Sequence, residues 1–137
     1  MSAGNGDRPA DLTVAAVIAR DAAGRVLVVR KRGTTRFMLP GGKLEPGETS
    51  FDAALRELRE EVGLALDPAR LAPVGSYLTD AANEPGYTLA SDVFEYADPV
   101  AGAAADAEIA ELDWIDPHGV SPAWAPLLIE LLPHLRA

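Results

Sequence analysis

Three glutamates stand close together in the middle of the chain, in the run Arg56-Glu57-Leu58-Arg59-Glu60-Glu61. Residues three and four apart are neighbours on a helix, so Glu57, Glu60 and Glu61 would share one strip of its surface and repel one another. A bound cation relieves repulsion of this kind. Because the chain has no cysteine, zinc–sulfur sites are excluded, and we expect a hard ion held by oxygen, Mg²⁺ with Mn²⁺ as the alternative.

The residues around these glutamates follow a set spacing. Gly42 is followed by five residues and Glu48, and then by seven residues and the run Arg56–Leu64. This is a complete Nudix box, so the chain resembles the Nudix hydrolase family. A charge run is more often a solvated helix face, but such a helix would need neither the Gly41-Gly42 pair nor Gly63. The spacing therefore favours a metal site built from a loop, a helix and a second loop.

The resemblance implies an α/β fold, an α/β/α sandwich with a mixed β-sheet. It also implies an enzyme that uses Mg²⁺ to hydrolyse the diphosphate linkage of a nucleoside diphosphate derivative. By the same likeness Glu57 and Glu61 bind the metal, Glu60 is a further ligand, and the backbone carbonyl of Gly41 completes the shell. The residues suit this chemistry, because Mg²⁺ neutralises charge that develops on the phosphates and lowers the pKa of a bound water.

The catalytic group implied by the resemblance is Glu60, Glu61 and Arg56, with Glu60 as the first choice for the base. In enzymes that resemble this one, the proton acceptor is sometimes an acid on a later loop instead. Glu108 and Glu111, which precede Trp114, are the candidates for that second acid, and the ordinary alternative is that both are only solvated.

The other fixed positions of the box are expected to hold the site in place. Arg56 and Glu48 should form a bidentate ion pair that ties the loop to the helix. Gly42 and Gly63 are counted with Glu48 as structural residues, and Gly63 should end the helix.

Basic residues and one aromatic residue close to the box are expected to bind the substrate: Arg30, Arg32, Lys43 and Phe37. We expect a nucleoside triphosphate or a small nucleotide conjugate. ADP-ribose or a nucleotide sugar is the alternative substrate, although residues 79–82 lack the proline or tyrosine that can mark ADP-ribose enzymes in this family. The rival from another class is a sensor that binds a nucleotide without turnover, and the intact set of glutamates argues against it.

Length and composition describe one globular domain over residues 11–137, after a flexible start over residues 1–10. The formal net charge of -9 argues against binding duplex nucleic acid, which needs a basic face. The sequence has neither a membrane-length apolar run nor a signal-peptide pattern, so we expect a cytoplasmic protein. A homodimer is the expected assembly.

Periodicity predicts the elements that position these residues. Apolar residues at helical spacing predict a helix over residues 51–62, with Thr49 or Ser50 as its N-cap. Strands are expected over residues 14–19 and 26–30, joined as a hairpin, and over residues 71–79, 88–96 and 109–115. Residues 40–42 should break the chain, residues 97–107 should form a loop, and residues 122–135 a terminal helix.

Overall fold

The computed structural model of the chain describes residues 12–81, 85–106 and 108–137. The flexible start predicted for residues 1–10 lies outside the described residues and stays a prediction. No helix within the described ranges is long and apolar enough to cross a membrane.

The strands form two small sheets. The larger sheet has the order β3 (Gly41–Lys43), β1 (Leu12–Ile18), β5 (Thr88–Tyr96) and β4 (Leu71–Asp80). Strand β1 runs parallel to β5 and antiparallel to β3, so this sheet is mixed, as the sequence predicts. The smaller sheet pairs β2 (Val26–Lys31) with β6 (Ile109–Ile115) in antiparallel register.

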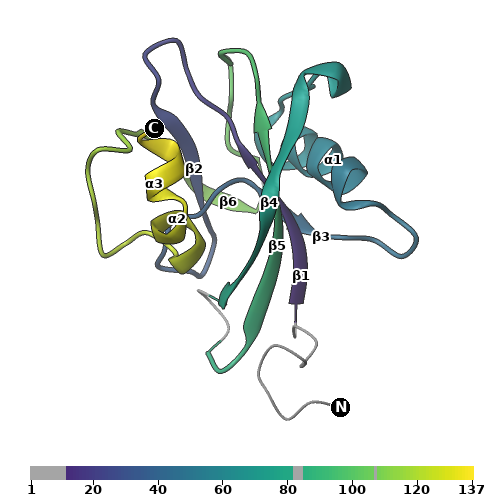
Figure 1. The fold of residues 1–137 in the computed structure, drawn as a ribbon, viewed down its shortest axis with the longest axis vertical. Helices are drawn as coiled ribbons and strands as arrows, with labels where there is room; N and C mark the ends of the chain where they lie inside the picture. The colour runs from purple at the N-terminus through teal and green to yellow at the C-terminus, as the bar shows by residue number, and fades with distance from the viewer. Residues whose placement is uncertain (1–11, 82–84, 107) are drawn as a thin grey trace.

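The helices lie on opposite sides of the strands (Figure 1). Helix α1 (Ser50–Val62) covers one side, while α2 (Pro126–Glu130) and α3 (Leu132–Leu135) cover the other. Side chains alternate across a strand, so β1 serves both layers: Ala15 and Val17 belong to the core beneath α1, and Ala16 and Ile18 to the core beneath α2 and α3. The predicted α/β/α sandwich is therefore confirmed.

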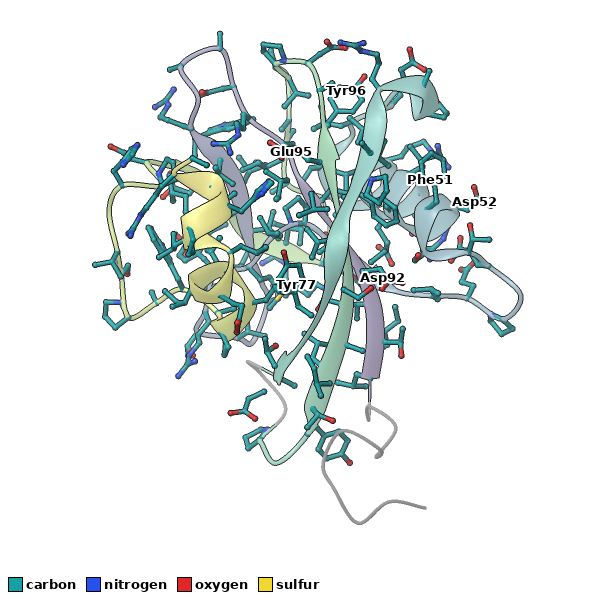
Figure 2. The ribbon with its side chains drawn as sticks, viewed as in Figure 1. Phe51, Asp52, Tyr77, Asp92, Glu95 and Tyr96 are labelled. Carbon is teal, nitrogen blue, oxygen red and sulfur yellow. The ribbon has the colours of Figure 1, made fainter. Side chains whose placement is uncertain are left out.

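Local signals in the sequence fix both ends of α1. The Thr49 hydroxyl oxygen accepts a hydrogen bond from the Asp52 N–H at 3.1 Å. At the other end Gly63 adopts a left-handed conformation, with φ of 69°, and donates to the Arg59 carbonyl. Phe51 lies in the first turn of α1 (Figure 2). Its ring packs edge-on against that of Phe94 of β5, with ring centroids 5.8 Å apart. The caps and this contact fix where the glutamates of α1 project.

The predicted hairpin of the first two strands is wrong in its pairing. Strands β1 and β2 belong to different sheets. Their described antiparallel pairing is one bridge beyond the end of β1, between Arg20 and Val26, where the Leu27 N–H donates to the Ala19 carbonyl at 2.9 Å. Both edges of β1 are occupied, one by β3 and the other by β5. A third strand cannot pair along β1, so β2 continues into the smaller sheet.

Two further predictions need correction. Gly41 and Gly42, expected to break the chain, instead begin strand β3, where a Cβ at Gly41 would overlap the carbonyl oxygen of Ala15. The terminal helix begins at Pro126 rather than at residue 122, because the Phe37 N–H and carbonyl are bonded to Ala123 and Ala125. It is also interrupted at Leu131, two residues before Pro133, which has no N–H to donate.

The remaining segments need only brief description. A 3-10 turn, η2 (Pro68–Arg70), leads into β4. The described part of the expected loop, residues 97–106, forms neither helix nor strand and returns the chain to the C-terminal end of α1.

Candidate functional site

Arg56 holds the loop before α1 against the helix. Its Nε and Nη2 atoms donate to the two carboxylate oxygens of Glu48, each at 2.8 Å, and Nη2 also donates to the Lys43 carbonyl at 3.1 Å. The predicted bidentate pair is thus confirmed. The hydrogen bonds from Arg56 lower the pKa of Glu48 to about 2, and Glu48 in turn raises the pKa of Arg56.

The same guanidinium also reaches two of the three glutamates on the helix. Its Nη1 atom donates to Glu57 at 3.3 Å and to Glu60 at 3.1 Å. The Arg56 side chain is 16% exposed, so these contacts lie in a partly desolvated place where charge pairing counts for more than at the open surface. One cation therefore offsets the repulsion between glutamates that the sequence indicates.

Glu61 has a different environment. Only 3% of its surface is exposed, and its Oε1 atom accepts a hydrogen bond from the Gly41 N–H at 3.0 Å. Its Oε2 atom is buried and has no hydrogen-bond partner, although Lys31 Nζ lies 3.4 Å away, in a poor orientation for a hydrogen bond. Burial raises the pKa of Glu61, an effect that the Lys31 charge opposes.

Gly42 lies directly against Glu57. A Cβ at Gly42 would overlap the Glu57 carboxylate, so glycine at this position lets that carboxylate lie directly against β3. The Glu57 side chain is 15% exposed, and burial raises its pKa against the opposing charge of Arg56. Gly42 was predicted to be a structural residue, and its contact with Glu57 gives a physical reason for glycine at this position.

The three glutamates open into a shared depression of about 230 Å³, which Asp106 and Glu108 also line. The Asp106 N–H donates to the Glu61 carbonyl at 3.0 Å, which fixes the loop before β6 to the end of α1. Every lining residue is acidic, so the depression offers only carboxylate oxygens, the ligands preferred by Mg²⁺ and Mn²⁺.

These residues fit a hard divalent cation, and the buried, unbonded Oε2 of Glu61 is the strongest single sign of it. The fit is not a finished cage. Within the described ranges, no three acidic or histidine side chains converge in metal-binding geometry, because Glu57 and Glu60 are turned toward Arg56. A bound cation would have to compete with Arg56 for these two carboxylates.

An apolar pocket of about 350 Å³ lies on the other side of β3. Apolar side chains form most of its lining, chiefly from β1, α2 and the segment before β3. Polar atoms enter from a few side chains: Lys31, Thr34, Lys43 and Asp80. Gly41 and Gly42 line this pocket too, while Gly42 also touches Glu57 and Gly41 binds Glu61. Strand β3 therefore lines the pocket and contacts two of the glutamates that line the depression.

The structure brings together only part of the residues that the sequence singled out. Glu57, Glu60, Glu61 and Glu108 line the depression, and Lys43, Gly41 and Gly42 line the pocket. Gly63 caps α1.

Four other candidates line neither cavity. Arg30 binds Glu111 at 2.7 Å, so these two charges satisfy one another. The backbone N–H of Arg32 donates to the Glu108 carbonyl at 2.9 Å. Phe37 packs against the core beneath α2 and α3 and is fixed by backbone bonds to the chain before α2.

Sequence reasoning missed Lys31 and Asp106 as members of the site. Lys31 was visible only as one of a run of basic residues, and nothing in the run distinguishes it from Arg30 or Arg32. Asp106 is an isolated acid in an alanine-rich segment. Each contacts Glu61 of α1, a residue far from it in the sequence, so no local pattern could have identified either one.

Comparison with known proteins identifies the family of this chain. A family model for the NUDIX domain matches residues 10–135. An RNA pyrophosphohydrolase of Halorhodospira halophila is 43% identical over 72 residues, which are 53% of this chain and 36% of that protein. The 8-oxo-dGDP phosphatase NUDT18 of Mus musculus is 49% identical over 43 residues, 31% of this chain and 13% of that protein. The chain thus spans well under half the length of either relative.

A solved structure extends the likeness to nearly the whole chain. A MutT NUDIX hydrolase from Burkholderia pseudomallei superposes with a TM-score of 0.75, covering 89% of this chain and 95% of that chain. At 19% sequence identity this likeness shows the fold alone.

Proposed function

The chain belongs to the NUDIX domain family, and from that premise we propose that it hydrolyses the diphosphate linkage of a nucleoside diphosphate derivative with Mg²⁺ or Mn²⁺. The substrate we propose is a nucleoside triphosphate or a small nucleotide conjugate. An intact set of box glutamates supports turnover rather than binding alone. The names of the two curated relatives, a pyrophosphohydrolase and a phosphatase, agree with chemistry at phosphate groups.

The observation that carries this proposal is the position of β3, which lines the apolar pocket and contacts Glu57 and Glu61 of the acidic depression. A nucleotide has an apolar, ring-containing part and a strongly anionic part. The apolar pocket suits the first, and a cation in the acidic depression suits the second. Because Gly41 and Gly42 line the pocket and contact Glu61 and Glu57 of the depression, we expect one extended ligand to reach both cavities.

Glu57 and Glu61 would hold the cation, with Glu60 as a further ligand, and the Gly41 carbonyl is proposed to complete the shell. When bound, the cation supplies charge neutralisation at the phosphates and a more acidic water. The fixed N–H bond from Gly41 orients the Glu61 carboxylate toward the depression. Arg56 would position these ligands, since its Nη1 atom donates to Glu57 and Glu60 while its Nη2 atom donates to Glu48 of the loop before α1.

A proton must leave the attacking water, and we consider two of the exposed carboxylates that line the depression as its acceptor. Glu60 remains the first choice for the base, and its side chain is 57% exposed at the end of the Arg56 contacts. Glu108 is the alternative, on the strand side of the same depression. Removal of the true base should lower kcat by roughly a hundredfold or more, whereas the other substitution should cost much less.

The lining of the pocket bears on substrate choice. It is largely aliphatic, and the aromatic residue expected to stack on a base, Phe37, is not part of it. A nucleobase would therefore be held by aliphatic contacts and by hydrogen bonds at the pocket rim, where Asp80 can accept from an amino group. Lys31 and Lys43 both line the pocket, and the Lys31 ammonium lies 3.4 Å from Glu61, so we expect the phosphates to pass these two side chains.

The test is turnover on a panel of nucleoside triphosphates, ADP-ribose, nucleotide sugars and dinucleotides, with Mg²⁺ or Mn²⁺ present and phosphate or pyrophosphate release measured. Glu61→Gln should lower kcat by roughly a hundredfold or more. Glu130→Gln, which removes one exposed carboxylate from α2, is the matched control and should retain wild-type rates. Saturable nucleotide binding without turnover would identify a sensor instead, and turnover that survives Glu61→Gln would refute the metal assignment.

A further inference from the structure

Lys31 is the one cation that approaches the buried carboxylate of Glu61 among the described contacts. Glu61 Oε2 is buried and unbonded, and Lys31 Nζ lies 3.4 Å from it. A buried carboxylate without a partner is costly, so this ammonium supports the ionised form of Glu61. The geometry at 3.4 Å is poor for a hydrogen bond, so Lys31 stabilises the Glu61 carboxylate chiefly through its charge. The Oε2 atom can therefore still bind a cation.

The strand carrying Lys31 is irregular at the point where this contact is made. The register between β2 and β6 shifts between Arg30 and Lys31. Arg30 is directed to Glu111 of β6, whereas Lys31 is directed to Glu61 of α1. A bulge redirects a side chain in this way, and here it separates a basic residue that pairs within the sheet from one that serves the site.

Lys31 also lines the apolar pocket, so one side chain links that pocket to Glu61 of the depression. Its side chain is 34% exposed and four carbons long, which lets the charged end move while the stem stays packed. Lys43 is the other lysine of the pocket, and its side chain is exposed.

We propose that Lys31 is an internal counter-ion for Glu61, which a divalent cation must displace before Glu61 can bind it. The inference rests on the proposed function, because it takes Glu61 as a metal ligand. Displacement leaves the ammonium at the rim of the pocket, next to the path of the substrate phosphates. Lys31 thereby weakens cation binding to the free protein and stabilises that protein while no cation is bound.

The experiment measures Mn²⁺ affinity by electron paramagnetic resonance at pH 8, and thermal unfolding in a chelator, for wild type, Lys31→Met and Lys43→Met. Lys31→Met should bind Mn²⁺ roughly tenfold more tightly, because one positive charge next to the site is gone. In chelator its Tm should fall by about 5 °C, since Glu61 then has no counter-ion. Lys43→Met removes the same charge from the same pocket and should change affinity less than about twofold.

A double-substitution cycle protects the test against a variant that folds poorly. In the Glu61→Gln background, Lys31→Met should leave the Tm in chelator almost unchanged, because the charge that it balances is already absent. Equal Mn²⁺ affinities and equal Tm values for Lys31→Met and Lys43→Met, alongside loss of Mn²⁺ binding in Glu61→Gln, would overturn this inference alone. Mn²⁺ binding that is unaffected by Glu61→Gln would overturn both the inference and the metal assignment in the proposed function.

Discussion

Two glutamates of the Nudix box, Glu48 and Glu61, have opposite electrostatic environments. Glu48 accepts hydrogen bonds from Nε and Nη2 of Arg56 and from the backbone N–H of Glu45, and these bonds lower its pKa to about 2. Glu61 is buried with one unbonded oxygen, and its pKa is raised. The box thus contains a carboxylate whose bonding is complete and another whose bonding is not.

The difference separates residues that hold the site from residues that act in it. A carboxylate with all its partners has no capacity left for a ligand, so Glu48 stabilises the loop. A carboxylate that is desolvated and lacks a hydrogen-bond partner lowers the stability of the fold. A ligand that binds this carboxylate restores that stability. On this argument, substitutions on the Arg56–Glu48 side should change folding most, and those on the Glu61 side should change cation binding most.

The largest expected loss of stability follows from removing Arg56. Arg56→Met leaves Glu48, Glu57 and Glu60 without their shared cation, and the free energy of unfolding should fall by about 2 kcal/mol or more. Urea unfolding measures this. Arg59→Met is the control, an exposed arginine on the same helix, and should lose well under half as much. Equal losses for the two variants would mean that Arg56 does not hold the site together.

The two adjacent glycines should separate folding from cation binding. A Cβ at Gly41 meets the backbone of Ala15, which cannot move aside, so Gly41→Ala should lower the free energy of unfolding by about 1–3 kcal/mol. A Cβ at Gly42 meets the side chain of Glu57, which can rotate away.

Gly42→Ala should therefore fold nearly as well as wild type while binding Mn²⁺ on the order of tenfold more weakly. Urea unfolding and Mn²⁺ titration of both variants measure the two effects. If Gly42→Ala lost as much stability as Gly41→Ala and kept its Mn²⁺ affinity, β3 would be a purely structural wall.

The pH dependence of stability should have opposite signs for the two carboxylates. The folded pKa of Glu48 is about 2, below its usual 4.5, so the unfolded chain binds more protons between these values. The stability that Glu48 contributes is therefore present above about pH 4.5 and is lost as the pH falls toward 2. The Tm of Glu48→Gln should change less steeply than that of wild type across this window.

Glu61 should behave in the reverse way in a chelator. Its folded pKa is raised, so its contribution is present below the unfolded value of 4.5 and is lost as the pH rises through the folded pKa. Glu61→Gln should thus gain in Tm relative to wild type as the pH rises above 4.5. If the Tm difference between wild type and Glu61→Gln stayed constant with pH, ionisation of Glu61 would not destabilise the folded protein.

Local chemistry explains which features the sequence could predict. The Thr49 cap, the Gly63 end of α1 and the Arg56–Glu48 pair depend on residues within one loop and one helix, so their spacing is sufficient. The gathering of the three box glutamates follows from helical periodicity in the same way.

What the sequence could not predict depends on distant partners. Pairing of β2 with β6 rather than β1 is decided by β3 and β5, which occupy both edges of β1. The approach of Lys31 to Glu61 requires a register shift in β2 and the packing of α1 on the sheets. The ion pair between Arg30 and Glu111 also depends on the pairing of β2 with β6, so the sequence alone could not predict it.

A second arginine–carboxylate pair provides the smallest expected effect and isolates the role of burial. Arg70 binds Asp98 through two hydrogen bonds of 3.0 and 2.8 Å, nearly the geometry of Arg56 with Glu48. The side chains of Arg70 and Asp98 are 50% and 46% exposed, against 16% and 14% for the pair in the site. Solvent screens the exposed pair, so Arg70→Gln should shift the Tm by about 1 °C or less and leave turnover unchanged. A shift as large as that of Arg56→Met would show that bidentate geometry, rather than desolvation and the additional carboxylates around Arg56, accounts for the stability of the box.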